Sequence, residues 1–574
     1  MRRIQRGFFP AAVLVASVLP AAADISGVVR EQGSGTPVVG ARVHVQADPT
    51  GPVAVTDAAG EFHLPVSPSD PVPLAASVLY DPAGANWVTG GTYASDGQTS
   101  VEILVPRLPV ADDPGYATGL PQVADCGSCH VDQVDQWGAG SHALAADDPW
   151  VRDLFSGDGT AGGSAGYVFT DLHDPGETGF CATCHAPMAD VFDPGNVMLD
   201  EVTSLAALDG VSCVSCHQMD RADPTATDAL AHLGGVGYRF PEGGTVPTQE
   251  YVWGPLDDVI FGGMQALYAP LFTESLVCAG CHEYVNPGTG APGQTTYSEW
   301  LDYAGSGPDA RTCQGCHMPA EDEPGYLVEP IGGPPLRPGE QRHRHEMVGS
   351  TPDTLAAAVD LTTEVAEASG RIAVTSTVRN VGAGHAFPTG FSTRNAILVI
   401  DATWNGQPLP QIAGPTVPFW ADDDEPGVQD GDLAGRAGTG FARVLEGRIN
   451  GAGPTVRPVL FIDADGVWES SMLPAGASRE VRVELRIPDG AAVGDVVEVR
   501  SRLLYRRAFR ALAVSKGWDI TPQGFPNEVE VARTEDEVVV TGAAGAVIPT
   551  AGPLGWLLLG VGIALVALML LRRR

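Results

Sequence analysis

Short alternations of apolar and polar residues dominate the chain after its first two dozen residues. Between residues 25 and about 108, runs such as ISGVV and GEFHLPV alternate with a period of two and are separated by Gly, Pro and Asp. This pattern is typical of half-buried β-strands joined by tight turns. It predicts a small β-sandwich over residues 24–110, in which His44 and His63 are surface residues.

The same pattern returns after residue 351. The stretches Arg371–Val378 and Val481–Ile487 alternate apolar and polar residues, and the second is followed by the turn sequence Pro-Asp-Gly. Period-two segments joined by turns predict a second β-sandwich. We place it over residues 351–546, with long loops near 413–440.

The region between the two sandwiches, residues 111–350, has a different texture. It is rich in Gly, Pro and Asp, contains all ten cysteines, and has few long periodic runs. We therefore expect a mainly α-helical and irregular region with little aliphatic material for a core. Something other than aliphatic packing must hold it together.

The two ends of the chain carry apolar segments of different kinds. Residues 1–23 join three arginines, an apolar stretch and three alanines, the order of a secretory signal peptide. The stretch is short and broken by Pro10 and Pro20, which disfavours an N-terminal membrane anchor. Residues 547–574 hold an uncharged apolar run that ends in three arginines, which predicts a single C-terminal transmembrane helix with those arginines in the cytoplasm. The segment also resembles the C-terminal sorting signals of some bacterial surface proteins, which implies its removal. We expect an exported, membrane-anchored protein whose body lies on the periplasmic or extracellular side.

All ten cysteines fall in five Cys-x-x-Cys-His motifs. Two thiols three positions apart can join the two vinyl groups of one haem, and the adjacent histidine then faces the iron as the proximal ligand. The sequence therefore predicts five covalently attached haem c groups, whose macrocycles supply the missing core. The attaching cysteines are Cys126, Cys129, Cys181, Cys184, Cys213, Cys216, Cys278, Cys281, Cys313 and Cys316, and the proximal histidines are His130, His185, His217, His282 and His317.

Other uses of paired cysteines fit this pattern less well. A disulfide framework does not require a histidine after every second cysteine. Zinc sites could be built from two Cys-x-x-Cys pairs each, but five pairs leave one pair over. A thioredoxin-type redox motif would not recur five times without its βαβ context.

Each iron has a second axial position, for which histidine and methionine compete. The predicted distal ligands are His142, His173, His232, His345 and His385, with His343 as a sixth candidate and Met188, Met198, Met219, Met264 and Met347 as rivals. If the segment between His130 and His142 is helical, its twelve residues separate them by about 18 Å. His142 should therefore serve a haem other than the one attached next to it.

Several segments resemble known families. The stretch CGSCHVDQVDQWGAGSHALA is similar to the C-x-x-C-H…W-x-x-S-x-H-A signature of the multihaem cytochromes that include hydroxylamine oxidoreductase and its tetrahaem electron-accepting partner. His343–Gly349 looks like the H-x-F-x-G ligand motif of that group, and Gly384–Gly390 resembles its G-H-x-x-P-T-G turn. The resemblance covers about 126–395 and implies that His142, His345 and His385 are distal ligands. Residues 25–64 resemble the carboxypeptidase regulatory-like, immunoglobulin-type domains of secreted proteins.

The sequence departs from the enzymes of that group. It has no Cys-x-x-Cys-Lys motif, the mark of the open catalytic haem in pentahaem nitrite reductases, and five haems are too few for the octahaem oxidoreductase. Catalytic activity therefore does not follow from the resemblance, and no catalytic residue is singled out.

The net charge of −37 disfavours nucleic acid and anionic lipid headgroups as partners. We expect a cytochrome that carries electrons between a membrane or periplasmic donor and an external acceptor, with redox proteins as partners. One alternative is an oxidoreductase that acts on a small nitrogen or sulfur compound at a five-coordinate haem. Another is a haem-bearing surface scaffold or adhesin. The sequence leaves the oligomeric state open.

Overall fold

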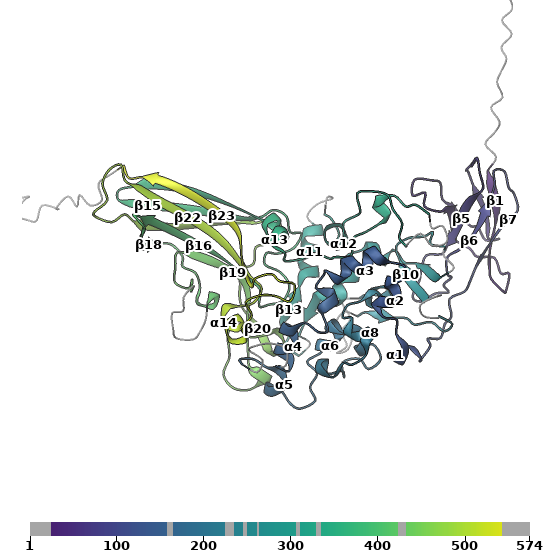
Figure 1. Ribbon diagram of the computed structural model, residues 1–574, viewed down its shortest axis with the longest axis horizontal. Coiled ribbons are helices and arrows are strands. Elements are labelled where there is room, and N and C mark those ends of the chain that lie inside the picture. The colour runs from purple at the N-terminus through teal and green to yellow at the C-terminus, as the bar shows by residue number, and fades with distance from the viewer. Residues whose placement is uncertain are drawn as a thin grey trace, which may run out of the picture.

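The computed structural model is elongated, with a β-rich region at each end and short helices between them (Figure 1). It describes residues 24–157, 165–223, 235–244, 250–260, 263–286, 288–305, 310–328, 335–422 and 432–541. Below, the N-terminal β region is 24–108, the central region is 111–350, and the C-terminal β region is 351–541. This order of strands, helices and strands agrees with the multidomain organisation expected from the sequence.

The N-terminal β region contains two small sheets around one apolar core. In the first sheet β1 pairs in parallel with β7 and antiparallel with β4, and the second has the order β3-β2-β5-β6. Ile25, Val29 and Leu64 are fully buried between the sheets, as the alternating pattern requires. The strands are β1 (Ile25–Glu31), β2 (Arg42–Val45), β3 (Ala54–Val55), β4 (Glu61–Leu64), β5 (Val72–Ser77), β6 (Gly90–Ala94) and β7 (Val101–Val105).

A charged contact joins this region to the central region. Asp257 accepts a hydrogen bond from Arg42 Nε at 2.8 Å and lies 3.0 Å from His44 Nε2. The neighbouring Asp258 pairs with the buried Arg337 at 2.9 Å. His44 is buried, so the prediction that it is a surface residue is wrong, whereas His63 is exposed. The partner of His44 comes from a distant part of the chain, so the sequence around His44 does not indicate that this side chain is covered.

The central region is built from short helices and two-stranded ribbons. Its helices, including 3₁₀ turns written η, are α1 (Tyr116–Gly119), α2 (Val123–Gly127), α3 (Val131–Gly138), η1 (His142–Leu144), α4 (Pro149–Phe155), α5 (Phe169–Leu172), α6 (Cys181–His185), α7 (Pro187–Asp190), η2 (Leu199–Glu201), α8 (Leu205–Leu208), α9 (Cys213–His217), η3 (Pro270–Thr273), α10 (Leu276–His282), α11 (Thr296–Ala304), α12 (Cys313–His317) and η4 (Gly339–Gln341). Its strands are β8 (Met219–Arg221), β9 (Gly237–Tyr238), β10 (Glu250–Gly254), β11 (Met264–Tyr268), β12 (Glu283–Val285) and β13 (Pro292–Thr295). Helices this short are unstable alone, so tertiary contacts must hold them.

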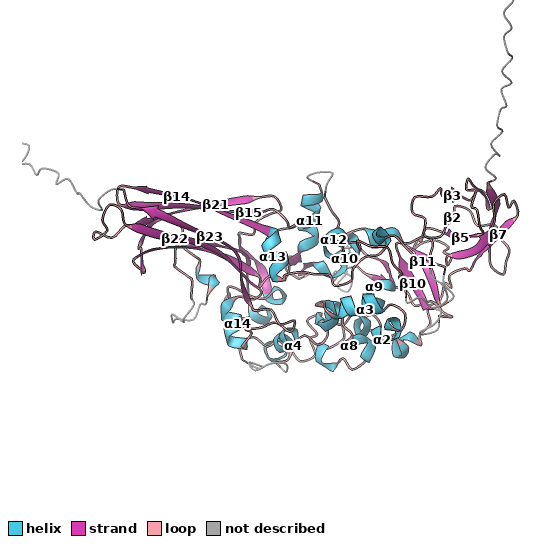
Figure 2. Cartoon of the chain, turned by 45° about the horizontal axis from the view of Figure 1, so that its top comes forward, coloured by secondary structure: helices cyan, strands magenta, loops and turns pink. Residues whose placement is uncertain are grey.

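The C-terminal β region consists of two sheets of long strands, which Figure 2 shows at the end opposite β1 to β7. One sheet has the order β14-β15-β21-β18 and the other β20-β19-β16-β22-β23, with β17 paired to β16. Its elements are α13 (Pro352–Ala358), β14 (Val359–Ala368), β15 (Arg371–Asn380), β16 (Asn395–Trp404), β17 (Gln407–Pro408), β18 (Gln411–Ala413), η5 (Phe419–Ala421), β19 (Gly438–Gly447), η6 (Ile449–Gly451), η7 (Phe461–Asp463), β20 (Ala464–Ser470), β21 (Ser478–Arg486), β22 (Val496–Arg506), α14 (Arg510–Lys516) and β23 (Glu528–Val539). Ile372, Val374 and Val483 are fully buried in their shared core. The two stretches whose alternation predicted strands therefore lie in β15 and β21.

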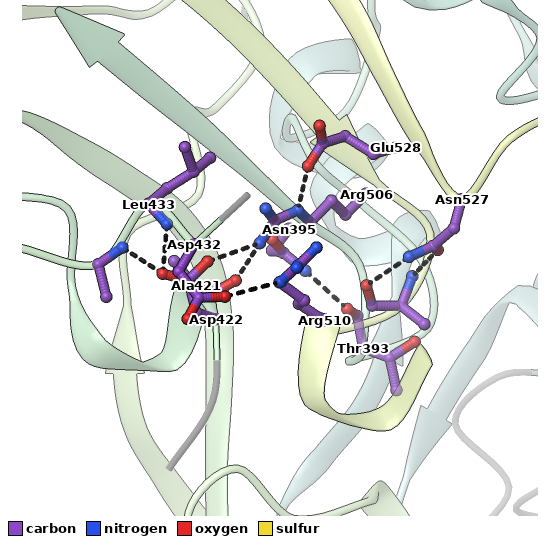
Figure 3. Close-up of polar contacts among 12 residues, drawn as sticks. Thr393, Asn395, Ala421, Asp422, Asp432, Leu433, Arg506, Arg510, Asn527 and Glu528 are labelled. Carbon is purple, nitrogen blue, oxygen red and sulfur yellow. Dashed lines mark hydrogen bonds and ion pairs between the residues drawn. The ribbon is translucent and has the colours of Figure 1, made fainter. Parts of the chain in front are cut away.

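A buried polar network anchors the loop that leads into β19 (Figure 3). Arg506, at the end of β22, is almost fully buried, donates to Glu528 at 2.7 Å and lies 3.5 Å from Asp422. Arg510 donates to Asp432 at 3.0 Å. The two arginines thus hold both described ends of the loop against β22 and α14.

A second buried pair attaches α14 to the central region. Lys516 donates to Asp153 of α4 at 3.3 Å, and Trp518 donates to the other carboxylate oxygen at 2.9 Å. The rings of Trp150 and Trp518 stack beside this pair with centroids 4.6 Å apart. Because the lysine and the aspartate are fully buried, this contact fixes the C-terminal β region onto the central region.

One part of the predicted fold class is corrected. In the described residues no helix is long and apolar enough to cross a membrane. For example, α11 has nine residues and is about 14 Å long, against about 30 Å of hydrocarbon in a bilayer. The segment 547–574, to which the transmembrane helix was assigned, lies outside the described residues, as does the expected signal peptide, 1–23.

Candidate haem-attachment sites

Every Cys-x-x-Cys-His motif lies at the end of a helix. In motifs 2 to 5, numbered in chain order, helices α6, α9, α10 and α12 end at the motif histidine. In motif 1 the helical turn continues past α2, because the amide of His130 donates to the carbonyl of Cys126 at 2.9 Å. Residues three apart on a helix share a face, so both thiols of each motif point to the same side. All ten cysteines are free of disulfide bonds, as thioether formation requires.

The motif histidines are oriented by hydrogen bonds at Nδ1. The bond partners are backbone carbonyls for His130 (Leu327, 2.8 Å), His185 (Ala145, 3.0 Å), His217 (Trp253, 2.8 Å) and His317 (Val348, 2.6 Å), and the Gln294 side chain for His282 (2.8 Å). In the four histidines that face a carbonyl, the Nδ1–H bond fixes the tautomer and leaves Nε2 with a lone pair for a metal. The atom that faces Nδ1 of His282 is the side-chain nitrogen of Gln294. Burial lowers the pKa of His282 to about 3, with further lowering by the charges of His142 and Arg394, so its imidazole is neutral. These residues fit haem c.

Two motif histidines face a second histidine at a spacing that suits a shared iron. The ring centroids of His282 and His142 are 6.2 Å apart, and those of His317 and His385 are 6.4 Å apart. Imidazoles on opposite sides of one metal ion, with bonds of about 2 Å, have centres about 6 Å apart. His142 thus lies beside motif 4 rather than its neighbour motif 1. That it serves a haem other than that of motif 1 stays a prediction.

Two further side chains lie near motifs 1 and 3. Burial first, and then the charges of His217 and His130, lower the pKa of His345 to about 4, so this histidine lies near both motifs. The Sδ atom of Met264 lies 3.5 Å from Nε2 of His130. A nitrogen and a sulfur ligand on opposite sides of an ion are about 4 Å apart, so a small outward shift would accommodate iron. Met264 was one of five methionines that the sequence could not separate.

The other predicted ligands are arranged differently. His173 is buried, its Nε2 lies 2.9 Å from Asp463 Oδ1, and its Nδ1 lies 3.1 Å from the carbonyl of Phe169. Because both ring nitrogens have partners, this arrangement does not support the prediction that His173 is a distal ligand. His343 is exposed, and its Nδ1 contacts the carbonyl of Met318 at 2.7 Å. His232 lies outside the described residues.

Motif 2 lacks a facing ligand of this kind within the described residues. The charge of His185 acts on His142, but the His142 ring faces that of His282, with centroids 6.2 Å apart. A cavity of about 570 Å³ lies next to this motif and is lined by Phe180, His173, Asp463 and Arg448. Phe180 directly precedes Cys181, so the cavity borders the attachment site.

Thiols of different motifs lie within hydrogen-bonding reach of one another. Cys126 contacts Cys213, Cys184 contacts Cys281, and Cys278 contacts Cys313. The last contact lowers the pKa of Cys313 to about 7, against the effect of burial. The contacts bring motif 1 next to motif 3, motif 2 next to motif 4, and motif 4 next to motif 5. These contacts join the attachment sites in two groups, motifs 1 and 3 and motifs 2, 4 and 5, so their spatial order differs from the chain order.

Some residues that hold these histidines were not found by sequence reasoning. Gln294, from β13, contacts His282, and Asn380 donates to the carbonyl of His385 at 2.8 Å. Glu299, from α11, accepts from the amide of Ala386 at 3.2 Å. Their residue types are common, and nothing in their local sequence marks them.

Comparisons with known proteins bear on the central region. The family described as Cytochrome c554 and c-prime matches residues 125–218, which include three of the five motifs. Among solved structures, a penta-heme cytochrome c552 from Thermochromatium tepidum aligns with a TM-score of 0.48 and 22% sequence identity, covering 74% of this chain and all of that chain. No curated protein matches the sequence. The family match supports a multihaem c-type cytochrome with covalently bound haem.

Proposed function

We propose that the chain is an exported pentahaem c-type cytochrome that carries electrons. The observation that carries this proposal is the facing of motif histidines by second imidazoles, at 6.2 Å for His142 and His282 and 6.4 Å for His317 and His385. Two axial protein ligands saturate an iron and leave no position for a substrate, which favours electron transfer over catalysis.

Each side chain has a defined task in this proposal. Haem c, when bound, supplies an iron that takes up and releases one electron. The motif cysteines would hold the porphyrin, and the motif histidines would bind its iron. As the second protein ligand we assign His142 to haem 4, His345 to haem 3, His385 to haem 5 and Met264 to haem 1, with haems numbered as their motifs.

The contacts between thiols of different motifs support transfer from haem to haem. Motif 4 neighbours both motif 2 and motif 5, so haem 4 would link branches of the array. The net charge of −37 favours docking of redox partners through positively charged surfaces. We propose redox proteins as donors and an acceptor outside the cell.

Haem quantification and EPR of the ferric protein test this proposal. The pyridine haemochrome assay should give five haems per chain, and replacing Cys313 and Cys316 by serine should give four. Low-spin signals should account for at least four haems. A haem content below five, or mostly high-spin iron, would contradict the proposal.

A second function is favoured by the surroundings of motif 2. A five-coordinate haem 2 could act on a small nitrogen or sulfur compound, and the cavity of about 570 Å³ beside Phe180 would admit one. A stoichiometric high-spin signal that persists in the intact protein and shifts when nitric oxide or cyanide is added would favour this function. If all five haems are low-spin, the ligand of haem 2 must be supplied by the protein, and electron transfer stands alone.

A further inference from the structure

The carboxylate of Glu299 lies at the centre of a compact hydrogen-bond network. Glu299 belongs to α11, between motifs 4 and 5, and is mostly buried, with a side-chain exposure of 13%. One oxygen accepts from the amide of Ala386 at 3.2 Å and from Thr389 Oγ1 at 2.5 Å. Its other oxygen accepts from Thr295 Oγ1 at 2.8 Å and from Arg443 Nη2 at 3.2 Å. Both oxygens are thus fully used.

Arg443 brings the C-terminal β region into this network. It lies on β19, its side chain is 14% exposed, and its other guanidinium nitrogen donates to Thr295 Oγ1 at 2.5 Å. A planar guanidinium presents its donors in a fixed fork, so Arg443 holds the carboxylate and the threonine in one orientation. The position of Glu299 is therefore set by a strand far from it in the sequence.

The network ends at the turn that carries His385. Asn380 donates to the carbonyl of His385 at 2.8 Å, and Glu299 accepts from the next amide, that of Ala386. The carbonyl of Ala386 in turn lies 2.9 Å from His385 Nδ1. The first two bonds both hold the peptide unit that joins His385 to Ala386, and the ring is oriented by the residue whose amide Glu299 binds.

We propose that Glu299, held by Arg443, is a positioning residue that fixes the plane of the His385 imidazole and through it tunes haem 5. This inference rests on the proposed function, in which His385 is the distal ligand of haem 5. Glu299 holds the amide of Ala386 and so fixes one side of this residue, whose carbonyl, in the next peptide unit, is aimed at Nδ1. Hydrogen bonding at that nitrogen raises the ligand strength of the imidazole. The C-terminal β region would thereby set the redox properties of a haem to which it contributes only one ligand.

The Glu299→Gln variant tests this inference. A glutamine has nearly the same shape as Glu299. Its NH₂ group replaces one carboxylate oxygen and cannot accept hydrogen bonds, so the donors that bind this oxygen lose their acceptor. We expect five haems to remain, while the low-spin EPR signal of one haem shifts and its midpoint potential changes in an EPR-monitored redox titration. Arg443→Lys keeps the charge but loses the fork, so it should shift the same signal less.

Glu446→Gln is the matched control, because Glu446 lies on the same strand as Arg443 but forms an exposed pair with Arg457. It should leave all signals and potentials unchanged. If Glu299→Gln, with five haems and an unaltered circular dichroism spectrum, leaves every signal and potential as in the parent protein, the inference is wrong.

The His385→Ala variant separates this failure from failure of the proposed ligation. A new high-spin signal in His385→Ala together with an unchanged Glu299→Gln spectrum would overturn only the positioning role. No change in His385→Ala would overturn the ligand assignment itself, and the inference with it.

Discussion

The imidazole rings of His317 and His385 are nearly parallel, with an interplanar angle of 8° and centroids 6.4 Å apart. The rings of His142 and His282, at a similar spacing, are inclined by 63°. Two pairs of the same chemical type therefore differ in the one angle that governs how imidazoles split the d orbitals of a shared iron.

The difference in ring angle predicts two distinguishable EPR signals. Parallel planes lift the near-degeneracy of the iron d orbitals and give a rhombic low-spin spectrum, whereas steeply inclined planes give a signal with a large maximum g value. His385→Ala should remove a rhombic signal, and His142→Ala should remove a large-g signal. Loss of the same signal in both variants would contradict the two assignments.

The Met264→His variant should lower the potential of one haem. Thioether ligation gives haem iron a higher potential than a second imidazole does, and Met264 Sδ faces His130 Nε2 at 3.5 Å. The parent protein should also show the long-wavelength absorption band of methionine-ligated ferric haem, and the variant should lose it. Met219→Leu is the control, because Met219 is a buried methionine with no such facing histidine in the described residues.

Asp153→Ala should destabilise the attachment of α14 to the central region. It leaves the fully buried Lys516 without its carboxylate and Trp518 without its acceptor, and breaking a buried pair costs about 3–5 kcal/mol. Urea unfolding followed by tryptophan fluorescence measures this loss. The double variant Asp153→Leu/Lys516→Met, which buries no charge, should recover a large part of it. Equal stability of the parent and Asp153→Ala would contradict the structural role.

Docking of the N-terminal β region should weaken as the pH rises. Burial lowers the pKa of His44, but its bond to Asp257 and the charges of Asp257 and Asp258 outweigh burial and raise it above 6.5. Protonated His44 therefore contributes its full stabilisation of the docked N-terminal β region below pH 6.5. This stabilisation is lost as the pH rises through the higher folded-state pKa of His44. For Asp257, hydrogen bonds to His44 and Arg42 outweigh burial and lower the pKa from 3.8 to about 2, so its contribution is present above pH 3.8 and lost as the pH falls toward 2.

Hydrogen exchange of the amides of β2 across this pH range, corrected for intrinsic rates, measures the effect. Protection should be highest between about pH 4 and 6.5 and decline above it. His44→Gln should flatten the alkaline decline, while His63→Gln, at an exposed pair with Asp24, should leave it unchanged. A decline that is the same in His44→Gln would show that another group is responsible.

The attachment chemistry could be predicted from sequence because it is local. Two cysteines and a histidine within five residues suffice to mark each site, and alternation at Ile372 and Val374 suffices to mark β15. Distal ligands depend on contacts between distant segments. His142, His345 and His385 could be proposed because a known pattern surrounds them, whereas nothing in the sequence separates Met264 from the other methionines.

Two expectations about histidines meet the same physical obstacle: the expectation that His44 faces solvent is wrong, and the prediction that His173 is a distal ligand is not supported. His173 is a residue type that binds haem iron, but it is paired with Asp463, from the C-terminal β region. His44 lies in an alternating strand and was expected to face solvent, yet it is covered by Asp257 from the central region. In both cases an acidic residue far along the chain pairs with the histidine, and the spacing of residues in the sequence does not predict such pairs.

The distance along the chain between a motif and the ligand proposed to face it has a consequence for biosynthesis. A haem can be joined to an extended chain, because the five residues that receive it are contiguous. The second ligands that we propose for haems 3, 4 and 5 come from elsewhere, and His385 is reached only at the turn after β15. Cofactor insertion can therefore precede folding, whereas completion of the iron coordination sphere cannot. A nascent chain that stops before His385 would carry every haem and yet leave haem 5 open to solvent ligands.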